Sequence, residues 1–274
     1  MDQLGDKENR PVEEVSTDIV KPFEFTGATA PSLKHPERNE DAYIFDEQGA
    51  WAAVFDGVGG LEAGDKASRI AKGVVAGKMA ALDSNDLDLV KKTIEASLVE
   101  AHYKIQSETS GAGTTGVIAK LVESDGKKKL VVGSVGDSRA YVLTFGELFR
   151  LTKDDSLMSD DASFDIDEAG SLEELAGEAR VQFPRRNIIT QGLGLGDEEP
   201  DVQVKSMGVK PGYKVILTSD GVQDNLTREE IQEEANKAKG EASGLVMRAR
   251  KRSQETGHFR SHKDDMSAVV IRVK

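Results

Sequence analysis

The chain has 274 residues, of which 38% are hydrophobic and 31% are charged, and its formal net charge is −13. This length gives one large domain or two small ones, and the acidic balance argues against nucleic acid as the main partner. The absence of cysteine excludes disulfides, zinc-thiolate sites and cysteine nucleophiles. No apolar run reaches the ~18 residues of a membrane span. The N-terminus also lacks the order of a signal peptide, so we expect a cytoplasmic protein without membrane contact.

The N-terminal segment is charged and poor in apolar side chains. We expect a flexible or loosely docked extension over residues 1–24, followed by the folded domain over residues 25–274. Residues 42–45 and 51–56 then predict two strands joined by a turn-rich link. An antiparallel hairpin of these strands places the acids just before the first strand beside the acid at the end of the second.

Apolar residues recur at helical spacing over residues 67–82 and again over 87–105, which predicts two consecutive helices. Asn85 or Asp86 is the expected N-cap of the second helix. We expect both helices to pack on one face of a sheet.

Four short apolar segments follow, separated by turns that mostly contain glycine: residues 113–121, 130–135, 140–143 and 148–151. Such short links predict an antiparallel meander. Asp137 lies in the turn between the second and third segments, where aspartate is common for its turn-forming chemistry alone.

Residues 154–178 carry ten acidic side chains and no lysine or arginine. We interpret residues 154–185 as a mobile, solvated acidic insertion that resembles a flap, with a short helix at 172–176. Asp165 and Asp167 also resemble the start of a calcium loop, but alanine stands at two of the later ligand positions, so the pattern fails.

The last third of the chain predicts two strands at residues 202–207 and 214–218, a helix opened by a capping box at Thr227, a helix near 241–252 and a final strand at 266–273. The order of strands and helix pairs indicates an α+β protein. Two packed antiparallel sheets flanked by helix pairs, a four-layer α-β-β-α sandwich, use every predicted element.

Acidic residues stand at the ends of several predicted strands: Glu40-Asp41, Asp56-Gly57, Asp220-Gly221 and Asp264-Asp265. In the sandwich these ends converge at one edge. Carboxylates without histidine or cysteine select Mg²⁺ or Mn²⁺, and crowded carboxylates repel one another unless cations neutralise them. Two such ions lower the pKa of a bound water, which suits the hydrolysis of a phosphoester.

Six segments of the chain form an ordered set: Asn39-Glu40-Asp41-Ala42, Phe55-Asp56-Gly57-Val58-Gly59-Gly60, Gly113-Thr114-Thr115, Val135-Gly136-Asp137-Ser138-Arg139-Ala140, Thr218-Ser219-Asp220-Gly221-Val222 and Asp264-Asp265-Met266-Ser267. This set resembles the motifs of the metal-dependent serine/threonine protein phosphatases of type 2C, in their bacterial form. The resemblance implies the same two-sheet sandwich and a dinuclear Mn²⁺ or Mg²⁺ centre. It also implies that a metal-bridging water attacks phosphoserine or phosphothreonine in proteins, and we expect these proteins to be substrates of a serine/threonine kinase.

The resemblance assigns metal ligands to individual residues. Asp56 would bridge both ions, and the carbonyl of Gly57 would bind the first. Asp220 and Asp264 would bind the second ion. Asp137, together with Asp220, matches the position of a third, weaker ion.

Further roles follow from the same resemblance. Glu40 and Asp41 would orient metal-bound waters. Asp265 stands where the family has asparagine, so we expect it to hydrogen-bond locally rather than to bind metal. Pro36 stands where many members have a phosphate-binding arginine, and we expect Arg38 to replace that arginine.

Two other functions stay open at this point. A pseudophosphatase or phosphoprotein-binding signalling module would keep the fold without turnover, and the loss of the arginine at position 36 favours it. A structural metal-binding protein is the third reading. Manganese-dependent hydrolysis of p-nitrophenyl phosphate separates an enzyme from both.

Overall fold

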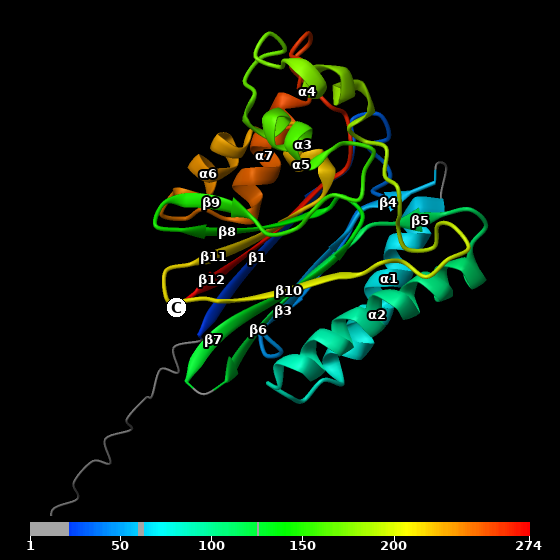
Figure 1. The fold of residues 1–274 in the computed structure, drawn as a ribbon, viewed down its shortest axis with the longest axis vertical. Coiled ribbons are helices and arrows are strands. Elements are labelled where there is room, and N and C mark those ends of the chain that lie inside the picture. The colour runs from blue at the N-terminus through cyan, green and yellow to red at the C-terminus, as the bar shows by residue number, and fades with distance from the viewer. Residues whose placement is uncertain (1–21, 60–62, 125) are drawn as a thin grey trace, which may run out of the picture.

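The computed structural model describes residues 22–59, 63–124 and 126–274. These residues form two five-stranded antiparallel sheets that lie face to face, with helices on both outer faces (Figure 1). The predicted α+β class and four-layer sandwich are confirmed. Within the described ranges, no helix combines the length and the apolar character needed to cross a bilayer.

Each sheet takes strands from distant parts of the chain. The first sheet has the spatial order β1 (Phe23–Ala30), β12 (Met266–Val273), β11 (Lys214–Thr218), β8 (Arg139–Thr144) and β9 (Glu147–Arg150). The second has the order β10 (Gln203–Gly208), β7 (Lys127–Val135), β6 (Gly116–Ser124), β3 (Trp51–Phe55) and β2 (Ala42–Asp46). A short ribbon of β4 (Gly57–Val58) and β5 (Gly113–Thr114) extends from the second sheet.

The helices cover the two outer faces in pairs, as predicted. Helices α1 (Ala63–Ala80) and α2 (Leu87–Glu108) contact the second sheet, and α6 (Arg228–Asn236) and α7 (Ala242–Arg252) contact the first. Asp86 caps α2 by accepting a hydrogen bond from the Leu89 amide, and the capping box of Thr227 and Glu230 is formed. A single helical turn, α5 (Asp220–Gln223), follows β11.

Strand β3 shows how the layers share one apolar segment. Its side chains alternate between two cores because successive residues of a strand face opposite ways. Ala52 and Val54 pack between the sheets, whereas Trp51, Ala53 and Phe55 pack under α1 and α2. All five are buried, so the strand end that carries Asp56 is fixed from both sides.

Strand β1 corrects the predicted N-terminal boundary. It pairs with β12 along its whole length, from Phe23 to Ala30, and Phe23 and Phe25 are buried. Residues 23 and 24 therefore belong to the domain and not to an extension. The rest of the predicted extension, residues 1–21, lies outside the described residues.

The predicted meander is wrong at Asp137. Strands β7 and β8 lie in different sheets, so the turn between them is a crossover rather than a hairpin. Gly136 adopts a φ of +92° in this crossover, and a Cβ there would lie 2.7 Å from Thr115 Cγ2. The crossover therefore requires glycine, and it places Asp137 between the two sheets. A short link in the sequence does not by itself distinguish pairing from crossing.

The acidic insertion, residues 154–185, is folded and packed. It contains α3 (Asp160–Glu168), α4 (Gly177–Gln182) and the 3-10 helix η1 (Phe183–Arg185), with turns in place of the predicted helix at 172–176. Figure 1 shows α3 and α4 at one end of the sandwich. A small apolar core holds them together: Ala162, Ile166, Ala169, Leu175 and Ala179. The prediction of a solvated segment is therefore wrong for this core, although most of its acidic side chains are exposed.

Candidate metal centre

Asp56 stands directly after β3, and two threonines hold its backbone. The Asp56 amide donates to Thr115 Oγ1 at 3.1 Å. Its carbonyl accepts from the Thr114 hydroxyl and from the Thr115 amide, each at 2.8 Å. Thr115 Oγ1 also lies 2.6 Å from Ser138 Oγ, beside Asp137. Two of the sequence motifs are thus hydrogen-bonded to each other and to Asp56.

Gly57 lies where neighbouring backbone leaves no room for a side chain. A Cβ at this position would lie 2.3 Å from the Gly64 carbonyl oxygen and 2.6 Å from that of Glu40. Only glycine fits here. This packing is a reason for glycine that is independent of any carbonyl ligand.

Asp41 lies beside Asp56 because β2 and β3 pair as predicted. The register joins Ala42 to Phe55, so the preceding and following residues face each other. Asp41 Oδ2 accepts a hydrogen bond from Ser219 Oγ at 2.6 Å. Burial raises the pKa of Asp41 to about 8, and the Ser219 hydrogen bond opposes this rise.

Asp220 and Asp264 come from neighbouring strands of the other sheet. Asp220 opens α5 after β11, and Asp264 precedes β12, its antiparallel neighbour. The Ser219 amide donates to the Ser267 carbonyl at 3.0 Å and ties the two strand ends together. Burial raises the pKa of Asp220 well above its usual range, and the charges of Asp264 and Asp137 raise it further.

These carboxylates converge on Asp56 from both sheets. Burial raises the pKa of Asp56 well above its ordinary value, and four neighbouring carboxylates raise it further: those of Asp220, Asp41, Asp264 and Asp137. We call the five residues Asp41, Asp56, Asp137, Asp220 and Asp264 the acid cluster. Glu40 lies at its border, where burial raises its pKa and the charge of Arg38 lowers it.

Asp137 is the member contributed by the crossover turn. Burial raises its pKa to about 7, and the charges of Asp154 and Asp224 contribute to the rise. Its carbonyl accepts from Gln223 Nε2 at 2.9 Å. The turn is therefore attached to the helix that begins at Asp220.

Asp264 and Asp265 have different surroundings. Asp265 is buried, and its two oxygens accept hydrogen bonds from the amides of Ser32 and Glu40, both at 2.6 Å. Asp264 Oδ1 accepts from the Asp265 amide at 2.9 Å, and its side chain is 37% exposed. Asp265 thus holds the backbone of residues 32–40. The charge of Asp264 instead raises the pKa of Asp56 and of Asp220.

The acid cluster has the chemistry of a cation site. Among the described residues, no lysine or arginine forms an ion pair with any of its five members. Asp41 Oδ1 and Asp220 Oδ1 are buried and have no hydrogen-bond partner within the described part of the chain. Buried carboxylates without partners are costly unless they are neutralised. Hard divalent cations fit this set of oxygen donors.

A second group of possible ligands lies nearby. Ligand atoms of His35, Glu40 and Asp265 lie within 4.8 Å of one another. Both oxygens of Asp265 already accept amide hydrogens. We therefore assign this group to holding the loop and not to a metal.

Comparison with known proteins decides the family. The profile of the family described as Protein phosphatase 2C matches residues 32–254. This chain belongs to the protein phosphatase 2C family. A serine/threonine phosphatase stp of Listeria monocytogenes serovar 1/2a is 31% identical over 208 residues, which cover 73% of this chain and 77% of the relative. The family predicted from the motifs is confirmed.

Solved structures share the fold of this phosphatase 2C chain. The S. agalactiae serine/threonine phosphatase superimposes with a TM-score of 0.73 at 22% identity, over 92% of this chain and all of the other. The catalytic domain of the serine/threonine protein phosphatase PstP, solved in complex with two manganese ions, gives a TM-score of 0.65 at 22% identity. It covers 91% of this chain and 97% of that domain.

The residue predicted to replace the arginine at position 36 already has an ion-pair partner. Arg38 Nη2 lies 3.1 Å from Glu40 Oε1. His35 Nδ1 donates to the Arg38 carbonyl at 3.1 Å and lies 3.8 Å from Asp265 Oδ1. The segment around Pro36 is thus held against Asp265 in this phosphatase 2C chain.

Sequence reasoning missed Asp224, which lies one helical turn after Asp220. Its amide donates to the Asp220 carbonyl at 2.8 Å, and its charge raises the pKa of Asp220 after burial and the charges of Asp264 and Asp137. The i, i+4 spacing from Asp220 was the available signal. Asp224 Oδ2 lies 3.4 Å from Arg186 Nε and accepts a hydrogen bond from Asn187 Nδ2 at 2.7 Å.

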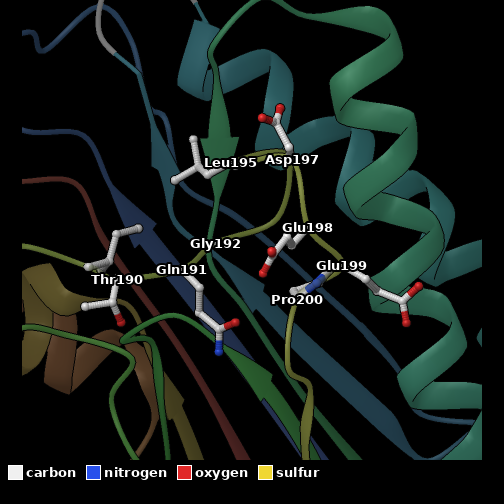
Figure 2. Close-up of a pocket in the computed structure, with 10 residues that line it drawn as sticks. Thr190, Gln191, Gly192, Leu195, Asp197, Glu198, Glu199 and Pro200 are labelled. Atoms are coloured by element: carbon white, nitrogen blue, oxygen red, sulfur yellow. The ribbon is translucent and has the colours of Figure 1, made fainter.

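One cavity of the described structure lies away from the acid cluster. It has a volume of about 580 Å³ and is lined by residues 189–192 and 195–200. Figure 2 shows Gln191, Glu198 and Pro200 on the wall of this cavity, beside α2. Gln106 of α2 anchors this loop by donating to the Gly196 carbonyl at 2.6 Å. Since the cavity contains none of the five acids, we place the chemistry at the acid cluster.

Proposed function

We propose that this chain is a metal-dependent phosphatase that hydrolyses phosphoserine and phosphothreonine in proteins. The observation that carries the proposal is the acid cluster, five carboxylates from two sheets without a lysine or arginine partner among the described residues. Family membership and relatives named serine/threonine phosphatase support it. The PstP catalytic domain with two manganese ions supports a dinuclear centre of Mn²⁺ or Mg²⁺.

Asp56 is our candidate for the ligand shared by both ions, with the Gly57 carbonyl on the first ion and Asp220 and Asp264 on the second. Asp137 and Asp220 would hold a third, weaker ion. When bound, such ions lower the pKa of water and neutralise charge on the phosphoryl group. The chain's own contribution is to fix these carboxylates before substrate arrives, because preorganised charges act without further rearrangement.

The neighbouring hydrogen bonds would keep this arrangement rigid. Thr114 and Thr115 fix the backbone of Asp56, and Ser219 orients Asp41. Asp265 holds the Glu40 amide. We propose that Glu40 and Asp41 orient water in the site, a role that such partners of metal ligands commonly have. The predicted contact of Arg38 with the substrate phosphate stays a prediction.

The substrates would be products of a serine/threonine kinase, and the protein would act in signalling. Its location in the cytoplasm stays a prediction.

Activity with and without metal tests the proposal. The purified protein should release phosphate from phosphoserine and phosphothreonine peptides with Mn²⁺ or Mg²⁺, and excess EDTA should abolish the release because the acid cluster would lose its cations. Readdition of Mn²⁺ should restore it. Undiminished turnover in excess EDTA would contradict the mechanism.

A pseudophosphatase is the second candidate, and Pro36 in place of the usual arginine favours it. Such a protein would bind phosphopeptides without releasing phosphate in saturating Mn²⁺. Measurable binding with no turnover of peptide or p-nitrophenyl phosphate would select this alternative.

A further inference from the structure

We propose that Arg186, at the end of the acidic insertion, binds the phosphate group of the substrate. The proposal rests on the proposed phosphatase function. It assigns the role of phosphate ligand to a guanidinium other than that of Arg38. Phosphate dianions are commonly bound by arginine because its planar fork matches two phosphate oxygens.

The position of Arg186 is fixed by contacts that lead to the acid cluster. Its Nε lies 3.4 Å from Asp224 Oδ2, and Asp224 follows Asp220 by one helical turn. His262 Nδ1 lies 3.4 Å from the same oxygen of Asp224, and His262 Nε2 lies 3.6 Å from Asp264 Oδ2. Asp224 thus links Arg186 to the helical turn that begins at Asp220, and Asp224 and His262 together link it to Asp264.

The guanidinium of Arg186 is held by several contacts that leave some of its N–H donors available. It stacks on the Phe183 ring with Cζ 4.3 Å from the ring centroid, and Nη1 donates to the Phe183 carbonyl at 3.2 Å. The contact with Asp224 uses Nε. Since a guanidinium has five N–H donors, Nη2 takes part in none of these contacts. Arg186 can keep its anchors and still donate to an anion.

The adjacent side chain adds a neutral donor. Asn187 Nδ2 donates to Asp224 Oδ2 at 2.7 Å and lies 3.3 Å from His262 Nε2. Asn187 is exposed, so the pair Arg186 and Asn187 borders solvent next to the cluster. A phosphoryl group held by a cation at Asp264 and Asp220 would lie next to Arg186 and Asn187.

Three other arginines near the cluster are less suitable. Arg139 is buried and donates to Asp154 and Asp167, and Arg260, 1% exposed, donates to backbone carbonyls. Arg38 forms an ion pair with Glu40 at 3.1 Å. The Arg186 side chain retains 15% exposure, more than Arg139 and Arg260 and less than the 26% of Arg38. Its ion pair with Asp224, at 3.4 Å, is longer than that of Arg38.

Steady-state kinetics and direct phosphate binding test the proposal. Arg186→Ala should raise KM for a phosphopeptide and the inhibition constant of inorganic phosphate by roughly ten- to a hundredfold, the usual effect of one lost charge-assisted contact. Arg186→Lys should show a smaller change because it keeps the charge. Arg185→Ala is the matched control, since Arg185 is the exposed neighbour, and its constants should equal those of the wild type.

Calorimetry of inorganic phosphate with the Mn²⁺-loaded protein separates this proposal from the proposed function. Weaker phosphate binding by Arg186→Ala at unchanged Mn²⁺ affinity supports the proposal even if the wild type has no turnover. Phosphate affinity and KM within twofold of the wild type would overturn it. So would an effect that disappears at saturating Mn²⁺, because Arg186 would then act on metal binding alone. If Arg186→Ala does not fold, phosphate affinity of Arg186→Lys equal to that of the wild type overturns the proposal.

Discussion

Two groups of buried and half-buried carboxylates in this molecule have opposite electrostatic surroundings. The first is the acid cluster. The second surrounds Arg139, whose guanidinium donates to Asp154 at 2.6 Å and to Asp167 at 2.8 Å. Burial alone would raise the pKa of Asp154, but the charge and hydrogen bonds of Arg139 hold it below its usual value. Burial raises the pKa of Asp56 well above its usual range, and the charges of the neighbouring carboxylates raise it further instead of opposing the rise.

The two groups differ in whether they contain a cation. The Arg139 group contains its own cations, with Arg150 as a second, so it is complete and holds α3 of the acidic insertion to β8. No lysine or arginine forms an ion pair with the acid cluster among the described residues, and we propose that cations from solution complete it. Burial of acids alone does not indicate a metal site; burial of several acids without an internal cation favours one.

Replacing each of the two aspartates that precede β12 by asparagine should have the largest effect. Asp264→Asn should lower kcat/KM by orders of magnitude, because it removes a candidate ligand of the second ion. Asp265→Asn should keep most activity but lower the free energy of unfolding by about 1–3 kcal/mol, since an amide can accept from only one of the two backbone amides it now serves. Kinetics and urea unfolding of both variants measure this. If Asp265→Asn is inactive and Asp264→Asn active, the assignment is reversed.

Removing the cation of the complete group should cost stability rather than activity. Arg139→Met leaves Asp154 and Asp167 buried beside one remaining arginine, and the free energy of unfolding should fall by about 3–5 kcal/mol. Arg150→Met is the control, because Arg150 contacts the same two acids at 3.4 Å and is more exposed. Urea unfolding compares them. A loss below about 1 kcal/mol for Arg139→Met would mean that the group is not held by this arginine.

The metal-free protein should lose stability as the pH rises. The folded-state pKa values of Asp41 and Asp137, about 8 and about 7, lie above the ordinary 3.8. The folded state therefore binds these protons more tightly, and the stabilisation is present at low pH and lost as the pH rises through 7 and 8. Urea unfolding in EDTA should show a decrease of several kcal/mol between pH 5 and pH 8, since each pKa unit corresponds to about 1.4 kcal/mol. Saturating Mn²⁺ should remove this decrease, and a rise in EDTA would contradict the account.

The smallest effect concerns the exposed acids of the insertion. Asp161 and Asp165 of α3 are exposed, and their charge should favour basic residues around the phosphosite by a few-fold in kcat/KM at low salt. Asp161→Asn with Asp165→Asn should reduce this preference. Asp88→Asn with Glu95→Gln on α2 is the matched control. Equal efficiencies for basic-flanked and acidic-flanked peptides at both salt concentrations would remove the idea.

Elements with strong local signals could be predicted from the sequence. The N-cap at Asp86, the capping box at Thr227 and the apolar strand β12 lie where their patterns placed them. Strand β1 was missed because only part of it is buried. It is a strand because it pairs with β12, at the other end of the chain.

The acids of the site could be found, but not their partners. The motifs identified Asp56, Asp220 and Asp264, and β2–β3 pairing placed Asp41 beside Asp56. The sequence does not show which acids are neutralised by arginine. Asp154 and Asp167 look the same in the sequence as the exposed acids around them, and only the fold brings Arg139 to them.

Titration of the metal-free protein with Mn²⁺ by calorimetry tests whether cations from solution complete the acid cluster. We expect at least two ions per chain for the wild type at neutral pH. Asp56→Ala should lose binding at both sites, because Asp56 is the proposed shared ligand. Wild-type stoichiometry and affinity in Asp56→Ala, or no Mn²⁺ binding by the wild type, would contradict the claim that the acid cluster is completed by cations from solution.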